Sequence, residues 1–152
     1  MEVVLQPLPR NEAARVHHLA LGPGQGAFVH SAADMAADDR PGIDLHRIAT
    51  GDETIGFFAI DRSGGPEATE LIGMLIGAQF QGRGHGRAAL AALPRYLRTA
   101  YPGLRTIRLV VDEANTIAAR AYLAAGWTAL DTPVAPGRSG PQRMMALSLG
   151  DG

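Results

Sequence analysis

Three glycines at alternate positions, Gly82, Gly84 and Gly86, separate two very different segments of this chain. Residues 71–80 form an apolar run of the strand type, and residues 88–97 repeat Ala and Leu at helical spacing. A glycine loop between a strand and the first turn of a helix points several backbone N–H groups in one direction. The helix dipole adds partial positive charge there. The pattern therefore predicts a phosphate or pyrophosphate site at the start of this helix.

The composition excludes several classes of protein. The 152 residues are 46% hydrophobic and 19% charged, which is typical of one folded domain spanning the sequence rather than of a disordered chain. A net charge of −1 argues against nucleic-acid binding through a basic surface. No apolar run is long enough to span a membrane, and no signal sequence precedes the first strand. We therefore expect a cytoplasmic protein that binds neither nucleic acid nor membranes.

Two residue types are missing, and each absence removes a kind of site. Without Cys the chain has no disulfide, no thiolate nucleophile and no Cys-ligated metal. Without Lys it has no P-loop lysine, which excludes a nucleotidase of that type. His17 and His18 are adjacent on a predicted helix and point in different directions, and no other His has a partner at a metal-ligand spacing. We expect no metal site.

Hydrophobic periodicity and turn residues predict a mixed α/β chain with a β-α-α-β-β-β-α-β-α-β-β order. We expect strands at residues 3–8, 43–50, 54–61, 71–77, 106–112, 127–130 and 144–149. We expect helices at residues 12–21 after an Asn11 cap, 32–38 after a Ser31 cap, 86–99, and 115–125 before a Gly126 cap. Pro94 should kink the third helix or end its regular part. Short turns imply antiparallel neighbours, and the crossover through the third helix implies one parallel pair.

Two interpretations of the glycine loop depend on no second motif elsewhere in the chain. The first is a tight turn that requires positive φ angles. The second is a dinucleotide-binding fold, because residues 84–89 fit G-x-G-x-x-A and Asp112 ends the next strand. However, that loop should open the first βαβ unit, Asp112 lies beyond the roughly 20-residue spacing, and too little chain remains for a second nucleotide half. Because residues 84–89 still match the motif, an NAD-dependent oxidoreductase is kept as an alternative hypothesis.

A third reading is a resemblance carried by two motifs. Gln81-x-x-Gly84-x-Gly86 resembles the Q/R-x-x-G-x-G/A pyrophosphate loop of the GNAT superfamily of N-acetyltransferases. The second motif is similar to that family's N-x-x-A-x-x-x-Y-x-x-x-G-F segment, with Trp in place of Phe: Asn115, Ala118, Tyr122, Gly126 and Trp127. The resemblance covers nearly the whole chain, most strongly residues 71–127. It implies a GNAT-like fold, with a central, mostly antiparallel sheet, one parallel crossover and helices on both faces.

The resemblance also implies a cofactor, acetyl-CoA, with CoA as the product. The pyrophosphate would be held by the loop residues Gln81, Gly82, Arg83, Gly84, His85, Gly86 and Arg87, chiefly through backbone N–H groups. The pantetheine arm would pair with backbone groups of the strand residues Leu75, Ile76 and Gly77. Asn115 would bind the cofactor arm, or it would only cap its helix.

In the family, an amine attacks the thioester directly through a tetrahedral intermediate. Tyr122 would then be the general acid for the departing thiolate, unless it is a core tyrosine, and the Ile76 N–H would stabilise the oxyanion. Glu70 is a candidate general base, although it could equally be a solvated strand end. His46 and Glu53 are further candidates. Transfer through ordered water without a dedicated base stays open.

The acceptor implied by the resemblance is a small-molecule primary amine, and residues 25–29 faintly resemble the Q-x-x-F-V segment of polyamine-type acetyltransferases. Asp34, Asp38 and Asp39 could attract a cationic amine or form a solvated helix face. Residues 133–141 could close over the acceptor. A protein amino group as acceptor, a non-catalytic acyl-CoA-binding module, and a monomer or a homodimer all stay open.

Overall fold

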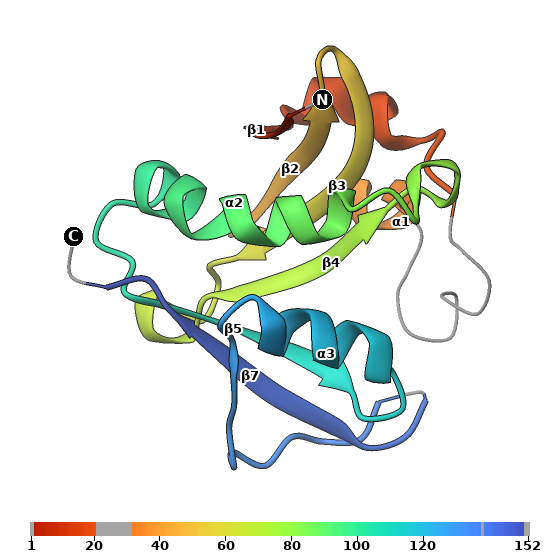
Figure 1. Ribbon diagram of the computed structural model, residues 1–152. Coiled ribbons are helices and arrows are strands. Elements are labelled where there is room, and N and C mark those ends of the chain that lie inside the picture. The colour runs from red at the N-terminus through yellow and green to blue at the C-terminus, as the bar shows by residue number, and fades with distance from the viewer. Residues whose placement is uncertain (1, 21–31, 138, 151–152) are drawn as a thin grey trace.

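The computed structural model describes residues 2–20, 32–137 and 139–150, and it follows the predicted order of elements. Figure 1 shows one twisted sheet with α2 and α3 on the near face. The strands are β1 (Val3–Pro7), β2 (Ile43–Thr50), β3 (Glu53–Asp61), β4 (Glu70–Ile76), β5 (Thr106–Asp112), β6 (Thr128–Ala129) and β7 (Gln142–Ser148). The α-helices are α1 (Ala32–Ala36), α2 (His85–Ala100) and α3 (Thr116–Ala124), and the 3₁₀ helices are η1 (Arg10–Val16), η3 (Pro66–Ala68) and η4 (Ala78–Phe80).

The seven strands form one sheet in the order β1-β2-β3-β4-β5-β7-β6. Every neighbouring pair is antiparallel except β4 and β5, which are joined by the crossover through α2. The mixed sheet with one parallel pair is therefore confirmed. None of the described helices is both long and apolar enough to cross a membrane.

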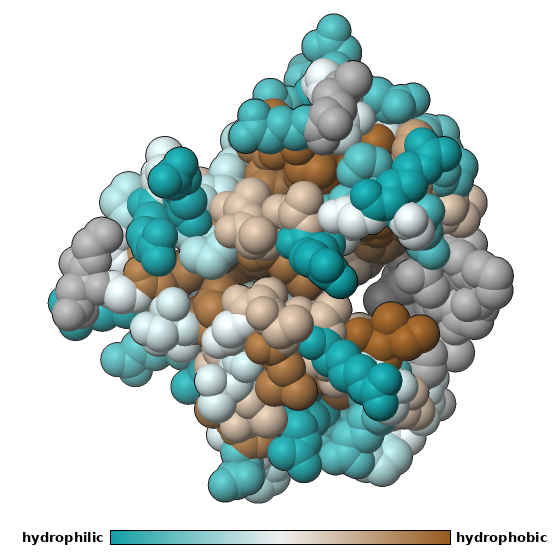
Figure 2. Space-filling view, viewed as in Figure 1, coloured by the Kyte–Doolittle hydropathy of each residue, from teal (hydrophilic) through white to brown (hydrophobic). Residues whose placement is uncertain are grey.

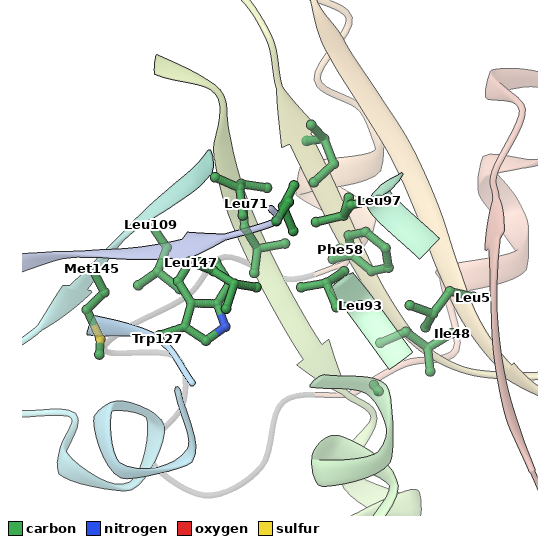
Figure 3. Close-up of a cluster of buried hydrophobic side chains, with 14 of the residues drawn as sticks. Leu5, Ile48, Phe58, Leu71, Leu93, Leu97, Leu109, Trp127, Met145 and Leu147 are labelled. Atoms are coloured by element: carbon green, nitrogen blue, oxygen red, sulfur yellow. The ribbon is translucent and has the colours of Figure 1, made fainter. Parts of the chain in front are cut away.

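Two hydrophobic clusters lie on opposite faces of the sheet. The larger one joins α2 and α3 to both halves of the sheet and includes Leu5, Phe58, Leu93, Leu109, Trp127 and Leu147 (Figure 3). The smaller one packs η1 and α1 against strands β2 to β4 only and includes Val16, Leu45, Phe57 and Leu75. Alternate residues along each strand therefore supply the two faces, as the period of two predicts.

A bulge in β4 shifts this alternation. Phe57 pairs with Leu75 and Ala59 with Ile72, so two β4 residues, Gly73 and Met74, lie opposite one residue of β3. Gly73 has φ +65°, and a Cβ on it would lie 1.9 Å from Met35 Sδ of α1. The left-handed backbone therefore favours glycine, and the flexible Met35 side chain fills the space that a Cβ would take.

Two expectations about secondary structure are corrected. Residues 10–16 form a 3₁₀ helix rather than an α-helix, and Pro9 rather than Asn11 stands at its N-cap. Proline fixes φ but has no side-chain acceptor that could cap the helix. This turn is therefore stabilised by packing of the buried Val16. The bounds of α2 agree with the prediction to within one residue, and the helix continues through Pro94 while Leu93 and Leu97 stay buried on its inner face. The strand expected at 127–130 is reduced to Thr128–Ala129. The Ser31 cap and the segment 25–31 lie outside the described residues.

Candidate active site

The sheet splits between β4 and β5. Glu70 and Arg108 are the single bridged pair of these two strands, supported by a 3.0 Å hydrogen bond from the Arg108 N–H to the Thr69 carbonyl. Beyond this pair the strands diverge toward the end of β4. The split therefore has a closed end at Glu70 and an open end at Ile76, and Figure 2 shows the surface hollowed between the α2 and α3 regions.

The backbone of β4 presents alternate residues to this split. The Gly77 N–H donates to the Ile55 carbonyl at 2.8 Å, so Gly77 and Leu75 direct their backbone groups to β3. Ile76, between them, directs its N–H and C=O into the split. Its carbonyl accepts a 2.8 Å hydrogen bond from Gln81 Nε2. Of the three predicted strand residues, Ile76 is therefore available to pair with a ligand, whereas the Leu75 and Gly77 backbone groups are used within the sheet.

The glycine loop lies at the open end of the split and leads into α2. Gly82 has φ +77° and Gly84 has φ +83°, both left-handed, and a Cβ on either would meet no atom within 4 Å. These two glycines are therefore required by the backbone, and the space beside them is free. Gly84 is the N-cap of α2 and provides no side-chain cap. The first intrahelical bond runs from Ala88 to the Gly84 carbonyl.

The N–H groups of the first helical turn thus have no partner within α2, as at any helix start. These N–H groups belong to His85, Gly86 and Arg87. The Arg83 and Arg87 side chains are exposed beside them, and His85 is half-buried. Partial positive charge, free donors and two guanidinium groups therefore gather at one end of the split, as the sequence predicts for an anion site.

Asn115 caps the other helix that borders the split. Its Oδ1 accepts a 3.3 Å hydrogen bond from the Ala118 N–H, and its own N–H donates to the Asp112 carbonyl at 2.9 Å. The predicted capping role is confirmed, and the side-chain Nδ2 is left as a donor for a second role. α3 itself buries no residue completely, and Ile117 is 83% exposed.

Tyr122 projects from α3 and packs edge-on against Trp127, with ring centroids 5.5 Å apart. The side chain is half-buried, and its hydroxyl bonds to no other described residue. Burial raises the pKa of Tyr122 to about 12. The hydroxyl is thus a proton donor at neutral pH, as a general acid must be.

Glu70 begins β4 at the closed end of the split and is half-buried. Its register neighbours are Asp61 on β3 and Arg108 on β5. Burial, and then the charge of Asp61, raise the pKa of Glu70, and Arg108 opposes this increase. By the strand alternation Glu70 shares a face with Ile72, which is the α1 face, opposite to Tyr122. A half-buried carboxylate of raised pKa therefore lies at the closed end of the split, on the α1 face of the sheet.

The contacts of His46 argue against it as a general base. His46 is buried with both ring nitrogens bonded, Nδ1 to the Tyr96 hydroxyl at 2.7 Å and Nε2 to the Tyr101 hydroxyl at 2.8 Å. Burial lowers the pKa of His46 to about 4. Glu53 is exposed in the β2–β3 hairpin, beyond the open end of the split. With both ring nitrogens bonded, His46 is not available to a group held between β4 and β5, whereas Glu53 stays a candidate.

The acidic residues around α1 are partly neutralised. Asp38 forms a salt bridge with Arg40 at 2.7 Å, and this partner lowers the pKa of Asp38 to about 2. Asp34 and Asp39 are exposed. Within the part of the chain that the structure describes, no group of His, Asp and Glu could hold a metal ion. Pro133 and Val134 border a hollow with Glu113 and Arg143 beside the start of β7.

Sequence reasoning missed the β4 bulge and the two residues around it. The signal was present, because a glycine inside a strand pattern marks a bulge or a close backbone approach. Gly73 is that glycine, and Met35 is the side chain that approaches it.

The residues present fit a phosphorylated cofactor with an extended arm. The free space beside Gly82 and Gly84 admits a phosphate against backbone donors, and the Ile76 backbone offers a donor and an acceptor along the split.

The comparisons with known proteins agree with this geometry. Comparison with curated protein sequences returned no match. The sequence model of the acetyltransferase (GNAT) family matches residues 14–127, three quarters of the chain. This region includes the glycine loop, Glu70, Asn115 and Tyr122.

Solved structures of several N-acetyltransferases share this fold. The ribosomal-protein-S18-alanine N-acetyltransferase from Escherichia coli aligns with a TM-score of 0.71 at 17% identity, over 99% of this chain and 96% of that one. Spermidine N-acetyltransferase from Vibrio cholerae, in complex with CoA and spermine, aligns with a TM-score of 0.71 at 17% identity, over 97% of this chain and 96% of that one. AAC(6′)-Ib, in complex with paromomycin and acetyl-CoA, aligns with a TM-score of 0.75 at 18% identity, over 97% of this chain and 94% of that one. This chain belongs to the GNAT family of acetyltransferases, enzymes whose acetyl donor is acetyl-CoA.

Proposed function

We propose that this protein transfers the acetyl group of acetyl-CoA to a primary amine of a small molecule. The observation that carries the proposal is the split between β4 and β5, with the first N–H groups of α2 at its open end and Glu70 at its closed end. The family and its amine-acetylating structural neighbours support the reaction type.

The backbone N–H groups of residues 82–87 would bind the pyrophosphate, and the Ile76 backbone would pair with the arm. Acetyl-CoA supplies a thioester whose carbonyl carbon receives the amine. Asn115 Nδ2 and the guanidinium groups of Arg83 and Arg87 are further donors on the two sides of the open end.

The β4 geometry affects how the catalytic roles are shared. Glu70 and Ile76 are six residues apart, about 20 Å along an extended strand, so they cannot act on the same carbonyl. We therefore propose that the Ile76 N–H stabilises the oxyanion and that Glu70 acts on the amine through ordered water.

Glu70 and Tyr122 approach the split from opposite faces of the sheet. Glu70 would accept the ammonium proton, directly or through water, because an alkylamine is mostly protonated at neutral pH. Tyr122 would give a proton to the departing sulfur. The amine would thus approach the thioester from the α1 face of the sheet, and the cofactor would lie on the face that carries α2 and α3.

Release of CoA, followed with a thiol reagent, tests the proposal. The panel should include spermidine, an aminoglycoside, simple α,ω-diamines and a peptide with a free amino terminus. Turnover with a small amine supports the proposal. Turnover with the peptide alone would move the acceptor to protein amino groups. Tight acetyl-CoA binding by calorimetry without turnover on any amine would favour a non-catalytic acyl-CoA-binding module.

A further inference from the structure

His18 has one ring nitrogen bonded to the backbone and the other free. Its Nε2 lies 2.8 Å from the carbonyl oxygen of Thr54, at the start of β3. A carbonyl can only accept a hydrogen bond, so Nε2 carries the proton and donates it. In the neutral imidazole, Nδ1 then has a lone pair and no proton. Among the described residues Nδ1 has no hydrogen-bond partner, and the His18 side chain is exposed.

This arrangement sets His18 apart from the other histidines that the structure describes. His46 is buried with both ring nitrogens bonded, and the rings of His17 and His85 form no hydrogen bond to a described residue. Only in His18 does one bond fix the tautomer while the second nitrogen stays open to a ligand. A histidine held in this way presents a defined hydrogen-bond acceptor.

Three contacts place His18 at the open end of the split. The Ala78 N–H donates to the Ala20 carbonyl at 2.8 Å, which ties the segment after η1 to η4, the turn that follows Ile76. The His18 ring lies edge-on to Phe80, with ring centroids 6.5 Å apart. Phe80 packs against both hydrophobic clusters, so it lies at the end of β4 between the two faces of the sheet.

The segment that carries His18 lies on the α1 face of the sheet. Its neighbours Val16 and Leu19 are buried in the smaller cluster, which is on that face. The proposed route of the amine to the thioester is on the same face. His18 and the Ile76 N–H are thus both at the open end, the first beside the route of the amine and the second beside the proposed oxyanion.

We propose that Nδ1 of His18 accepts a hydrogen bond from the nitrogen of the acceptor amine and orients it toward the thioester carbonyl. The inference rests on the proposed function and deepens it by naming an acceptor-binding residue; Glu70 remains the proposed proton acceptor. A primary amine suits this role, because it keeps an N–H for Nδ1 while its lone pair attacks the carbonyl. An ammonium donor makes the bond charge-assisted and so stronger.

The experiment measures binding of butane-1,4-diamine to the protein saturated with CoA, by calorimetry. CoA carries no acetyl group, so the complex forms without turnover. His18→Gln is the test variant, because the glutamine Nε2 can still donate to the Thr54 carbonyl but no atom replaces Nδ1. We expect its affinity for the diamine to fall about tenfold, and its affinity for CoA to stay within about twofold of wild type. The KM for the diamine should rise by a similar factor, with a smaller change in kcat.

Two further variants test the assignment to Nδ1. His17→Gln is the matched control, because it makes the same change at the adjacent exposed residue, and it should bind the diamine and CoA as wild type does. His18→Asn places an amide oxygen near the position of Nδ1 and should recover part of the affinity that His18→Gln loses.

The tautomer is measured on the wild-type protein with ¹⁵N-labelled histidine at about pH 8, where imidazoles are neutral. The His18 signals are those absent from His18→Gln. We expect a protonated Nε2 and an unprotonated Nδ1. Adding butane-1,4-diamine to the CoA complex should move the Nδ1 signal and leave Nε2 nearly unchanged. This measurement needs no variant to be active.

Several outcomes would overturn the inference. They are a protonated Nδ1, an Nδ1 signal that the diamine leaves unmoved, and diamine affinities of His18→Gln within about twofold of wild type. An equal loss in His17→Gln would assign the effect to the segment rather than to Nδ1. If wild type binds CoA but not the diamine, the inference fails alone, whereas absence of CoA binding overturns the proposed function as well.

Discussion

The Nε2 of His46 and the hydroxyl of Tyr101 lie 2.8 Å apart, and this contact fixes the direction of a buried chain of hydrogen bonds. Tyr101 donates its one hydroxyl proton to Asp44 Oδ2 at 2.7 Å, so its oxygen accepts from the His46 Nε2–H. Neutral His46 then has a bare Nδ1, which accepts from the Tyr96 hydroxyl. Arg62 completes the chain by binding both oxygens of Asp44. The chain ties β2 to the C-terminal half of α2.

This network predicts a loss of stability in acid. Burial lowers the pKa of His46 from 6.5 to about 4, so the unfolded state takes up its proton first as the pH falls. The contribution is fully present above pH 6.5 and is lost as the pH falls to about 4, amounting to about 3 kcal/mol. Urea unfolding at stepped pH should show this slope, and His46→Gln should flatten it. An unchanged slope in His46→Gln would assign the acid sensitivity to other groups.

Replacing Tyr122 by Phe should lower kcat by about tenfold to a hundredfold, because the ring is kept and the proton donor is lost. Binding of acetyl-CoA, measured by calorimetry, should change less than about threefold. Turnover equal to that of the wild type would remove Tyr122 as the general acid and leave it as a core aromatic against Trp127.

Glu70→Gln should reduce kcat/KM about a hundredfold and remove the acid limb of its pH profile. Since burial and Asp61 raise the pKa of Glu70, that limb should lie above pH 4.5, the ordinary value for a glutamate. The matched control is Glu53→Gln in the exposed hairpin, which should behave as wild type. Retention of the acid limb in Glu70→Gln would favour transfer through ordered water without a dedicated base.

Gly84→Ala tests the anion site. A left-handed Ala costs about 1–2 kcal/mol, and relief of this strain would turn the first N–H groups of α2 away from their common direction. Gly103→Ala is matched, because Gly103 has φ +90° and equally free space but lies at the far end of α2. Both variants should melt lower by similar amounts, and Gly84→Ala alone should lose cofactor affinity. Equal cofactor affinities in the two variants would show that the loop does not bind the phosphate.

Two substitutions at Asn115 separate its cap from its cofactor role. Asn115→Ala should destabilise the protein by about 1 kcal/mol through the lost Ala118 bond. Asn115→Asp keeps the cap acceptor and removes the Nδ2 donors, so its melting temperature should match wild type while acetyl-CoA binds more weakly. Unchanged binding in Asn115→Asp would restrict the residue to capping.

Much of this architecture could be predicted from residue patterns, and the exceptions have physical causes. Local signals gave β5, α2 and the Asn115 cap, because each depends on period, turn chemistry or a single side chain. The turn at η1 was misjudged because its conformation depends on packing of Val16 rather than on its own propensity.

The site was predictable where it depends on the backbone of a motif and less so where it depends on long-range contacts. The glycine loop follows from its spacing, whereas the burial of His46 depends on Tyr96 and Tyr101, which lie 50 and 55 residues away. The availability of Ile76 rather than Gly77 depends on the register between β3 and β4, which the bulge at Gly73 resets.

The two hydrophobic clusters have a mechanical consequence. β4 and β5 share one backbone bridge. Among the described residues, the buried cluster on the α1 side stops at β4, whereas the cluster on the α2 and α3 side continues across both halves of the sheet. The hydrophobic packing that holds the two halves together therefore lies on the face that carries α2 and α3.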